Sequence, residues 1–201
     1  MQKLLLPSVL SFLLLLGGCA SRPPEPQLNM EQRQLLWESH RQQIMKLVSW
    51  RLEGRLGLRV PGQSGAMSVD WQQNPNDYTI YLDGPLGQSL AKVQGHSGSV
   101  IVEASGEKYT GNSPEQLLRQ VTGWDLPVSH LRYWVLGLPD PGAPFDLLLD
   151  NAGNPSVLKQ SGWVIEYQLF RPQNQLPVPA RMKARQGDIQ MTLVTRNWQL
   201  L

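Results

Sequence analysis

Residues 50–60, WRLEGRLGLRV, alternate between apolar and charged side chains, and this two-residue period strongly constrains the fold. The apolar positions are Trp50, Leu52, Leu56, Leu58 and Val60, and the charged ones are Arg51, Glu53, Arg55 and Arg59. Successive side chains of a strand point to opposite faces, so the segment predicts a strand with one apolar and one solvated face. A sheet of such strands has to bury its apolar face against another element.

Similar segments follow along most of the chain and predict an antiparallel meander. Short apolar segments at 67–71, 78–82, 90–93 and 100–102 are separated by turn-forming residues. Further strands are predicted at 145–150, 157–160 and 163–170, and a last hairpin at 180–185 and 189–197. The prolines at 172, 177 and 179 predict an irregular connection before that hairpin.

One helix is predicted ahead of the meander. Asn29 and Gln32 have the spacing of a capping box, and the helix is expected over residues 30–48. Its apolar residues at helical spacing are Met30, Trp37, Ile44 and Val48. These residues predict the buried side of an amphipathic helix.

Two further helices are predicted inside the meander. Ser113 and Pro114 begin the first, which Gly123 ends, and the second is expected over 127–136. Because a long meander with one apolar face has to curl or be covered, the expected fold class is mainly β with α. We expect an open, incompletely closed antiparallel β-barrel with a helical lid over its open side.

Aromatic residues and methionines gather on the faces predicted to point inward. They occur together with aliphatic residues at Trp50, Trp71, Trp163, Ile165, Tyr167, Met182, Met191 and Leu193. One explanation is ordinary core packing. The other is that part of this face lines an apolar cavity, because tryptophan and methionine form adaptable walls for a flexible apolar ligand.

The first residues predict export and a lipid anchor. Lys3 precedes an apolar run over 4–16, which is short for a membrane span and typical of a signal peptide over residues 1–18. Residues 16–19, LGGC, resemble a bacterial lipobox, whose cysteine carries S-linked diacylglycerol and an N-linked acyl chain. An ordinary signal peptide with an incidental cysteine is the alternative, but Cys19 is the only cysteine of the chain.

Residues 19–28 are expected to be the lipidated cysteine and a flexible, proline-rich tether, followed by a single domain over 29–201. Ala20 follows the cysteine where an aspartate commonly retains a lipoprotein in the inner membrane. The sequence therefore favours an outer-membrane location, anchored by lipid and facing the periplasm of a Gram-negative bacterium.

Catalytic and metal-binding patterns do not occur in the sequence. It contains neither a Gly-x-Ser-x-Gly elbow nor a phosphate-binding loop. His40, His96 and His130 lack the paired spacing of a zinc site, and we expect them at the surface or at helix caps. The net charge of +2 argues against a nucleic-acid partner. We expect no enzymatic activity, no metal and no cofactor other than the lipid on Cys19.

Several segments of the chain form a recognisable set. They are Trp71-Gln72-Gln73, Asp77-Tyr78, Gly84-Pro85-Leu86-Gly87, the stretch LRYWVLGLP at 131–139, Pro179-Ala180-x-Met182 and Asn197-Trp198. These segments resemble the LolB family of outer-membrane lipoprotein receptors. Together with the lipobox they cover nearly the whole chain. The resemblance implies a half-barrel with a helical lid over an apolar cavity.

The resemblance also implies a function and a set of partners. The protein is expected to accept acylated lipoproteins from a LolA-type periplasmic carrier and to insert them into the outer membrane as a monomer. The side chains expected around the cavity are Leu52, Leu56, Leu58, Val69, Trp71, Ile80, Leu82, Leu131, Val135, Trp163, Ile165, Tyr167, Met182, Met191 and Leu193. An envelope lipoprotein that binds another lipid or a glycan in this cavity is the alternative.

One exposed leucine has a predicted role at the membrane. Residues 83–89, DGPLGQS, predict a type I turn, with Pro85 in its second and Gly87 in its fourth position. In such a turn Leu86 has a negative φ and gains nothing from exposure to water. We expect the loop of Pro85, Leu86 and Gly87 to meet lipid and promote release of the cargo.

Overall fold

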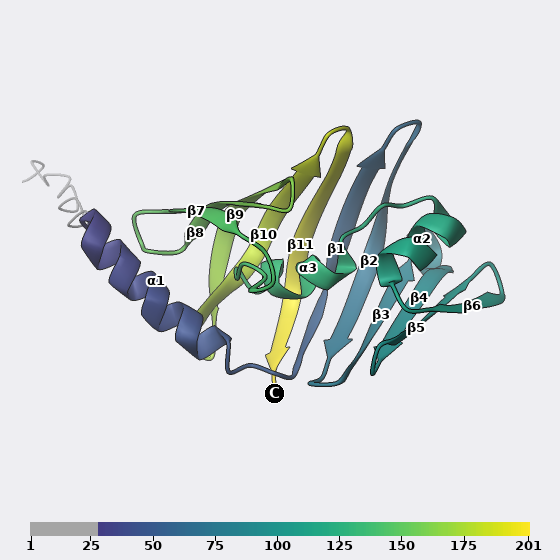
Figure 1. The fold of residues 1–201 in the computed structure, drawn as a ribbon, viewed down its shortest axis with the longest axis horizontal. Helices are drawn as coiled ribbons and strands as arrows, with labels where there is room; N and C mark the ends of the chain where they lie inside the picture. Colours follow the sequence, from purple (N-terminus) through teal and green to yellow (C-terminus); the bar gives the residue numbers. More distant parts are fainter. Residues whose placement is uncertain (1–27) are drawn as a thin grey trace, which may run out of the picture.

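The computed structural model describes residues 28–201 (Figure 1). The predicted signal peptide, the acylated Cys19 and the tether up to residue 27 lie outside the described residues. None of the helices in the described part is long and apolar enough to span a bilayer. The core side chains extend from Trp37 to Trp198, so the described part contains a complete hydrophobic core.

Eleven antiparallel strands form one sheet in the order β6-β5-β4-β3-β2-β1-β11-β10-β9-β8-β7. The strands are β1 (Trp50–Val60), β2 (Gln63–Gln73), β3 (Asp77–Asp83), β4 (Ser89–His96), β5 (Ser99–Ala104), β6 (Glu107–Gly111), β7 (Phe145–Leu149), β8 (Pro155–Gln160), β9 (Trp163–Gln173), β10 (Leu176–Gln186) and β11 (Ile189–Leu200). The first and last strands pair at the centre, and β6 and β7 remain at two free edges. The expected open antiparallel sheet is therefore confirmed.

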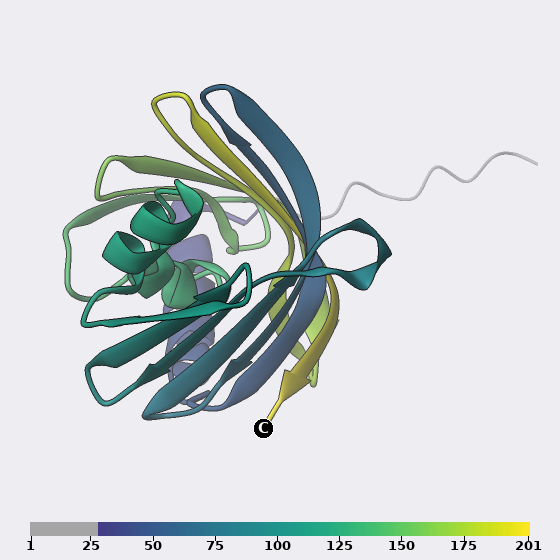
Figure 2. The same cartoon turned by 90° about the vertical axis from the view of Figure 1, so that its right-hand side faces the viewer.

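Within residues 28–201, three helices accompany the sheet: α1 (Met30–Ile44), α2 (Pro114–Thr122) and α3 (Val128–Trp134). The sheet curves around α2 and α3, which lie on its concave face (Figure 2). The predicted capping box is present in α1, where Asn29 Oδ1 accepts a hydrogen bond from the Gln32 amide over 2.8 Å and Gln32 Oε1 accepts one from the Asn29 amide over 2.9 Å. Thus local sequence signals correctly place the helix starts.

The buried side of α1 differs from the prediction. The helix ends at Ile44 instead of continuing to 48, and Met30 is 83% exposed and Val48 56% exposed. Trp37, His40 and Ile44 are buried instead, so the expectation of a surface histidine at position 40 is wrong. Packing against the sheet decides which side is buried, since α1 lies along β10 and β7.

The expected irregular connection around the late prolines is wrong as well. Strands β9 and β10 run through Pro172, Pro177 and Pro179, and a short turn at 174–175 joins them. Pro172 and Pro177 face each other, so the two missing N–H donors fall at one position of the ladder. A register shift beside Pro179 accommodates the third proline.

Gly54 allows the central strands to approach closely. The register of β1 against β11 shifts between Glu53 and Gly54, which indicates a bulge. A Cβ atom at Gly54 would lie 2.5 Å from the Val194 carbonyl oxygen, whereas one at Gly57 would meet nothing closer than 3.8 Å. A glycine inside a strand often marks such a bend or close backbone approach.

We expect Gly54→Ala to lower the free energy of unfolding by about 1–3 kcal/mol, because the added methyl group forces the backbone of β11 to move. Gly57→Ala is the matched control and is expected to change it by about 0.5 kcal/mol or less. Urea unfolding of residues 20–201 measures both. Equal effects of the two substitutions would contradict the proposed close approach at Gly54.

Candidate functional site

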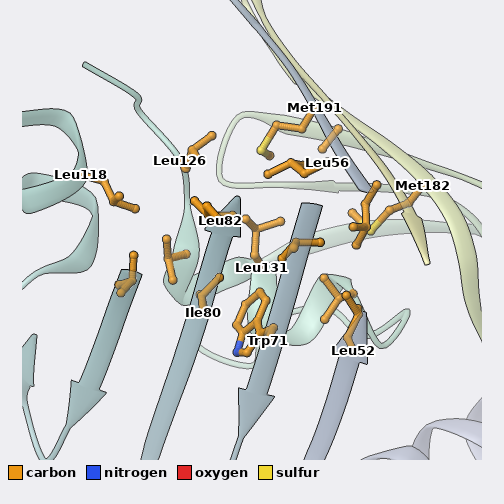
Figure 3. Close-up of a pocket in the computed structure, with 16 residues that line it drawn as sticks. Leu52, Leu56, Trp71, Ile80, Leu82, Leu118, Leu126, Leu131, Met182 and Met191 are labelled. Carbon is orange, nitrogen blue, oxygen red and sulfur yellow. The ribbon is translucent and has the colours of Figure 1, made fainter. Parts of the chain in front are cut away.

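An apolar cavity lies between the concave face of the sheet and the two short helices (Figure 3). Its lining consists of Leu52, Leu56, Val69, Trp71, Ile80, Leu82, Val93, Leu118, Leu126, Val128, Leu131, Val135, Met182, Ala184, Met191 and Leu193. In Figure 3, Leu118 and Leu131 face the side chains of the strands from the helical side. Apart from the indole N–H of Trp71, these side chains have no hydrogen-bonding group, so the cavity can hold a ligand only by burying apolar surface.

The free volume of the cavity is about 60 Å³. For comparison, an engineered apolar cavity of about 150 Å³ holds one benzene molecule. The helices therefore close over the sheet in this conformation, and the space left is too small for an acyl chain.

The structure brings together eleven of the fifteen side chains that the sequence places around a cavity. These are Leu52, Leu56, Val69, Trp71, Ile80, Leu82, Leu131, Val135, Met182, Met191 and Leu193. The same face also contributes Val93 and Ala184, which the two-residue period of their strands points to. Leu118, Leu126 and Val128 come from the helices and their connection, where no strand-like period marks them.

Four of the expected side chains lie away from the cavity: Leu58, Trp163, Ile165 and Tyr167. All four are buried. Trp134 covers this part of the sheet, because its ring packs against Trp163 at a centroid distance of 6.1 Å and its carbonyl accepts a 3.0 Å hydrogen bond from the Tyr167 hydroxyl. All four are buried as predicted, and Trp134 fills the space above Trp163 and Tyr167 on β9.

Gln160 anchors the carboxyl end of α3 to the sheet. Its Oε1 accepts hydrogen bonds from Trp134 Nε1 over 2.9 Å and from the Asp140 amide over 2.8 Å. Its Nε2 donates to the carbonyls of Asp140 and Ala143 over 2.7 and 2.9 Å. Because this buried amide is fully paired, the end of α3 is firmly held.

The start of α3 is tied to α2 instead of to the sheet. The Ser129 amide donates a 2.8 Å hydrogen bond to Glu115 Oε1. Burial by itself would raise the pKa of the Glu115 carboxyl, but hydrogen bonds from Ser129 and Ser113 lower it below its usual value. The charged carboxylate therefore links the two helices at neutral pH. Together, α2 and α3 form a lid, in which α2 packs on β5 and β6 and the carboxyl end of α3 is held by Gln160.

The loop between β3 and β4 contains the short 3-10 turn η1 (Pro85–Gly87) and differs from the predicted turn. Leu86 has a φ of 67° and a ψ of 15°, so the expected negative φ is wrong. The Gly87 amide donates to the Gly84 carbonyl over 3.2 Å, and a positive φ at the third position is typical of a type II turn. A left-handed conformation disfavours leucine by about 1 kcal/mol or more.

Leu86 is also fully exposed to solvent. The loop projects from the side of the sheet opposite to α2 and α3 (Figure 2). Strained backbone conformations that do not stabilise a fold gather at functional sites, so the φ of Leu86 marks this loop as a candidate site.

Ionisable side chains of the described part do not form a metal site. Within residues 28–201, no group of three or more histidine, cysteine, aspartate or glutamate side chains could hold a metal ion. His130 Nδ1 lies 2.6 Å from Asp140 Oδ2, and the imidazole stacks on Trp134 at a centroid distance of 5.3 Å. This pair braces the segment that follows α3.

Residues 48–198 match the sequence model of a family described as outer membrane lipoprotein LolB. The chain is 40% identical over 190 residues to the outer-membrane lipoprotein LolB of Pseudomonas paraeruginosa, covering 94% of this chain and 93% of the relative. It is 38% identical over 192 residues to that of Pseudomonas syringae pv. syringae, covering 95% and 94%. These matches extend over nearly the full length of both relatives.

A solved structure of a LolA superfamily protein from Nitrosomonas europaea resembles this fold with a TM-score of 0.53. The alignment covers 87% of this chain and 94% of that protein, at 8% sequence identity. At this identity the likeness concerns the fold alone.

We expect Leu131→Gln to weaken binding of an apolar fluorescent probe about fivefold or more, because it places an unpaired amide in the apolar cavity. Leu148→Gln makes the same chemical change on β7, where the side chain is exposed, and should leave binding unchanged. Fluorescence titration of residues 20–201 measures both affinities. Equal affinities would show that the probe binds outside this cavity.

Proposed function

Because the chain belongs to the LolB family of outer-membrane lipoproteins, which gives it a role in lipoprotein localisation, we propose that it receives acylated lipoproteins from a LolA-type carrier and inserts them into the outer membrane. It is an outer-membrane lipoprotein and not an enzyme, as its sequence predicts. The acyl chains of the cargo are held in the apolar cavity. That cavity, lined by sixteen apolar residues between sheet and lid, is the observation that carries the proposal.

The size of the hydrophobic effect explains why a cavity is needed. Each methylene group transferred from water gains about 0.8 kcal/mol, so an acyl chain of about fifteen methylenes gains about 12 kcal/mol. A triacylated protein therefore cannot cross water without cover for its chains. Since no nucleotide is hydrolysed in this proposal, each handover runs downhill from carrier to receptor to bilayer.

Entry of an acyl chain requires the lid to move, because the closed cavity has a free volume of about 60 Å³. The hydrogen bonds of Gln160 and Tyr167 hold α3 at its carboxyl end, so we place the hinge there. The start of α3 moves away from the strands, and α2, which packs on β5 and β6, has to shift with it because Glu115 joins the two helices. Separating apolar side chains from the sheet costs free energy, which burial of the acyl chain offsets.

The lipid anchor and the exposed loop give the protein two contacts with the membrane. The anchor is the S-linked diacylglycerol and N-linked acyl chain proposed at Cys19, and several chains hold a protein far more firmly than one. Leu86 is the second contact, since insertion into lipid removes an apolar side chain from water. A glycan ligand finds little support, because sugars need hydrogen-bonding partners that the apolar cavity does not offer.

We expect residues 20–201 to take up an acylated lipoprotein from a loaded LolA-type carrier, because the receptor is the more favourable site for the acyl chains. The complex is isolated by affinity pull-down and the cargo is detected by immunoblot. The same cargo without acyl chains is the control and should not bind. Cargo that stays on the carrier at all receptor concentrations would contradict the proposal.

We expect Leu86→Glu to preserve folding and uptake of lipoprotein but to reduce delivery to liposomes about tenfold or more, since a carboxylate resists transfer from water into lipid. Gln88→Glu adds the same charge two residues away, leaves Leu86 in place, and should deliver cargo normally. Delivery is measured by flotation of labelled cargo with the vesicles. Equal delivery by Leu86→Glu and the parent chain would remove the loop from the mechanism.

A further inference from the structure

A second, polar pocket adjoins the apolar cavity. Its volume is about 240 Å³, and it is lined by Trp71, Gln73, Tyr78, Val128, Ser129, Arg132, Tyr133 and Asp140. Trp71 and Val128 line both spaces, so the polar pocket begins where the apolar cavity ends. An amphipathic molecule can therefore occupy the two together.

Three buried polar atoms of this pocket have no hydrogen-bond partner among residues 28–201: Trp71 Nε1, Gln73 Oε1 and the Tyr78 hydroxyl. Trp71 is 4% exposed and Gln73 is 5% exposed. Buried polar groups are nearly always paired in proteins, because leaving them unpaired destabilises the fold. All three atoms belong to residues that line one pocket, which makes this pocket the candidate site for a polar ligand group.

The orientation of the Gln73 amide follows from its other contacts. Its Nε2 donates hydrogen bonds to the carbonyls of Asn74 and Asp77 over 2.7 and 3.4 Å. Both of those atoms are acceptors, so the nitrogen is the end of the amide that faces them. The free Oε1 is therefore a buried acceptor on a residue that lines the pocket.

Tyr78 is held as a donor on the other side. Its ring lies flat against Gly95, where a Cβ atom would come within 2.2 Å of Cε1. Burial, and then the nearby Glu115 carboxylate, raise the pKa of Tyr78 to about 12 against the opposing effect of Arg132. The hydroxyl therefore keeps its proton at neutral pH and can donate it to an acceptor, as the indole N–H of Trp71 can.

The chemistry of these groups selects the ligand. Two neutral donors suit a carbonyl oxygen, and one amide acceptor suits an N–H or O–H group. The nearby Asp140 carboxylate is already engaged, by His130 Nδ1 at 2.6 Å and by the Gly142 amide over 2.8 Å. The one cationic side chain of this lining, Arg132, is exposed at the mouth of the pocket. A buried carboxylate would lack a buried cation, so a neutral ester or amide fits better.

We propose that this pocket binds the ester or amide group at the head of an acyl chain whose hydrocarbon part enters the apolar cavity. The inference rests on the proposed function in one respect, namely that the hydrocarbon part of the chain occupies the apolar cavity. It adds a polar contact that sets how deep a chain can enter. It also allows the protein to distinguish acyl groups from plain alkyl chains of the same length.

Two glycerol lipids test the inference, because they differ only at the carbonyl. Monolauroylglycerol carries an ester, and 1-O-dodecylglycerol has an ether in its place. We expect residues 20–201 to bind the ester about three- to tenfold more tightly, as measured by displacement of an apolar fluorescent probe. Equal affinities would overturn the polar site while leaving the apolar cavity in place. Failure of both lipids to bind would overturn the proposed function as well.

Tyr78→Phe removes the hydroxyl and nothing else. We expect it to reduce the preference for the ester to less than about twofold and to raise the midpoint of urea unfolding, because an unpaired buried group is lost. A structural role of the hydroxyl predicts the opposite change in stability. Tyr109→Phe, whose hydroxyl bonds to Glu107 on β6, is the control and should keep the preference.

Two further outcomes would overturn the assignment. One is an unchanged ester preference in Tyr78→Phe. The other is that laurate binds more tightly than monolauroylglycerol and loses that advantage in Arg132→Gln, which would make the pocket a site for free carboxylates.

Discussion

The burial of one apolar sheet face is the constraint on which the rest of this structure depends. Eleven strands present that face on the inside of a curve, and an open sheet does not cover it by closing on itself. Over β8 and β9, Trp134 and the paired amide of Gln160 complete a conventional core. Over β1 to β4, β10 and β11, the sheet is covered by the lid of α2 and α3, and in the proposed function this cover is exchanged for acyl chains.

Groups that do not stabilise the isolated fold lie near the lid of α2 and α3 and in the distant loop between β3 and β4. The unpaired polar atoms of Trp71, Gln73 and Tyr78 lie at the end of the cavity. Leu86 combines full exposure with a left-handed backbone on the opposite side of the sheet. Each of these features is unfavourable in the protein alone and becomes favourable when a partner covers it. In the proposed function, the unpaired polar atoms lie where acyl chains enter and Leu86 lies where the protein meets the membrane.

Most of the strands and both lid helices could be predicted from local patterns. The two-residue period identified the inward faces, and capping residues such as Asn29 and Ser113 located the helix starts. The late prolines predicted an irregular connection where the structure has two long strands. Two of these prolines face each other across β9 and β10, so the other positions of the ladder keep their hydrogen bonds. The exposure of Met30 and Val48 was not predicted either, because neighbouring elements decide which apolar residues of a helix are buried.

The sequence by itself determined the inward face, most of the turns, the caps of α1 and α2 and the resemblance to a family, because each depends on residues close together in the chain. Only the tertiary structure decided which part of that face is a cavity. Tyr167 and Met182 have the same apparent inward position in sequence, yet Trp134 covers the first and the lid leaves space beside the second. The polar pocket was likewise invisible, because Gln73, Tyr78 and Arg132 meet only when α3 lies across the ends of β2 and β3. Whether a polar atom of Trp71, Gln73 or Tyr78 has a hydrogen-bond partner depends on residues distant in the chain, so a local sequence pattern does not show it.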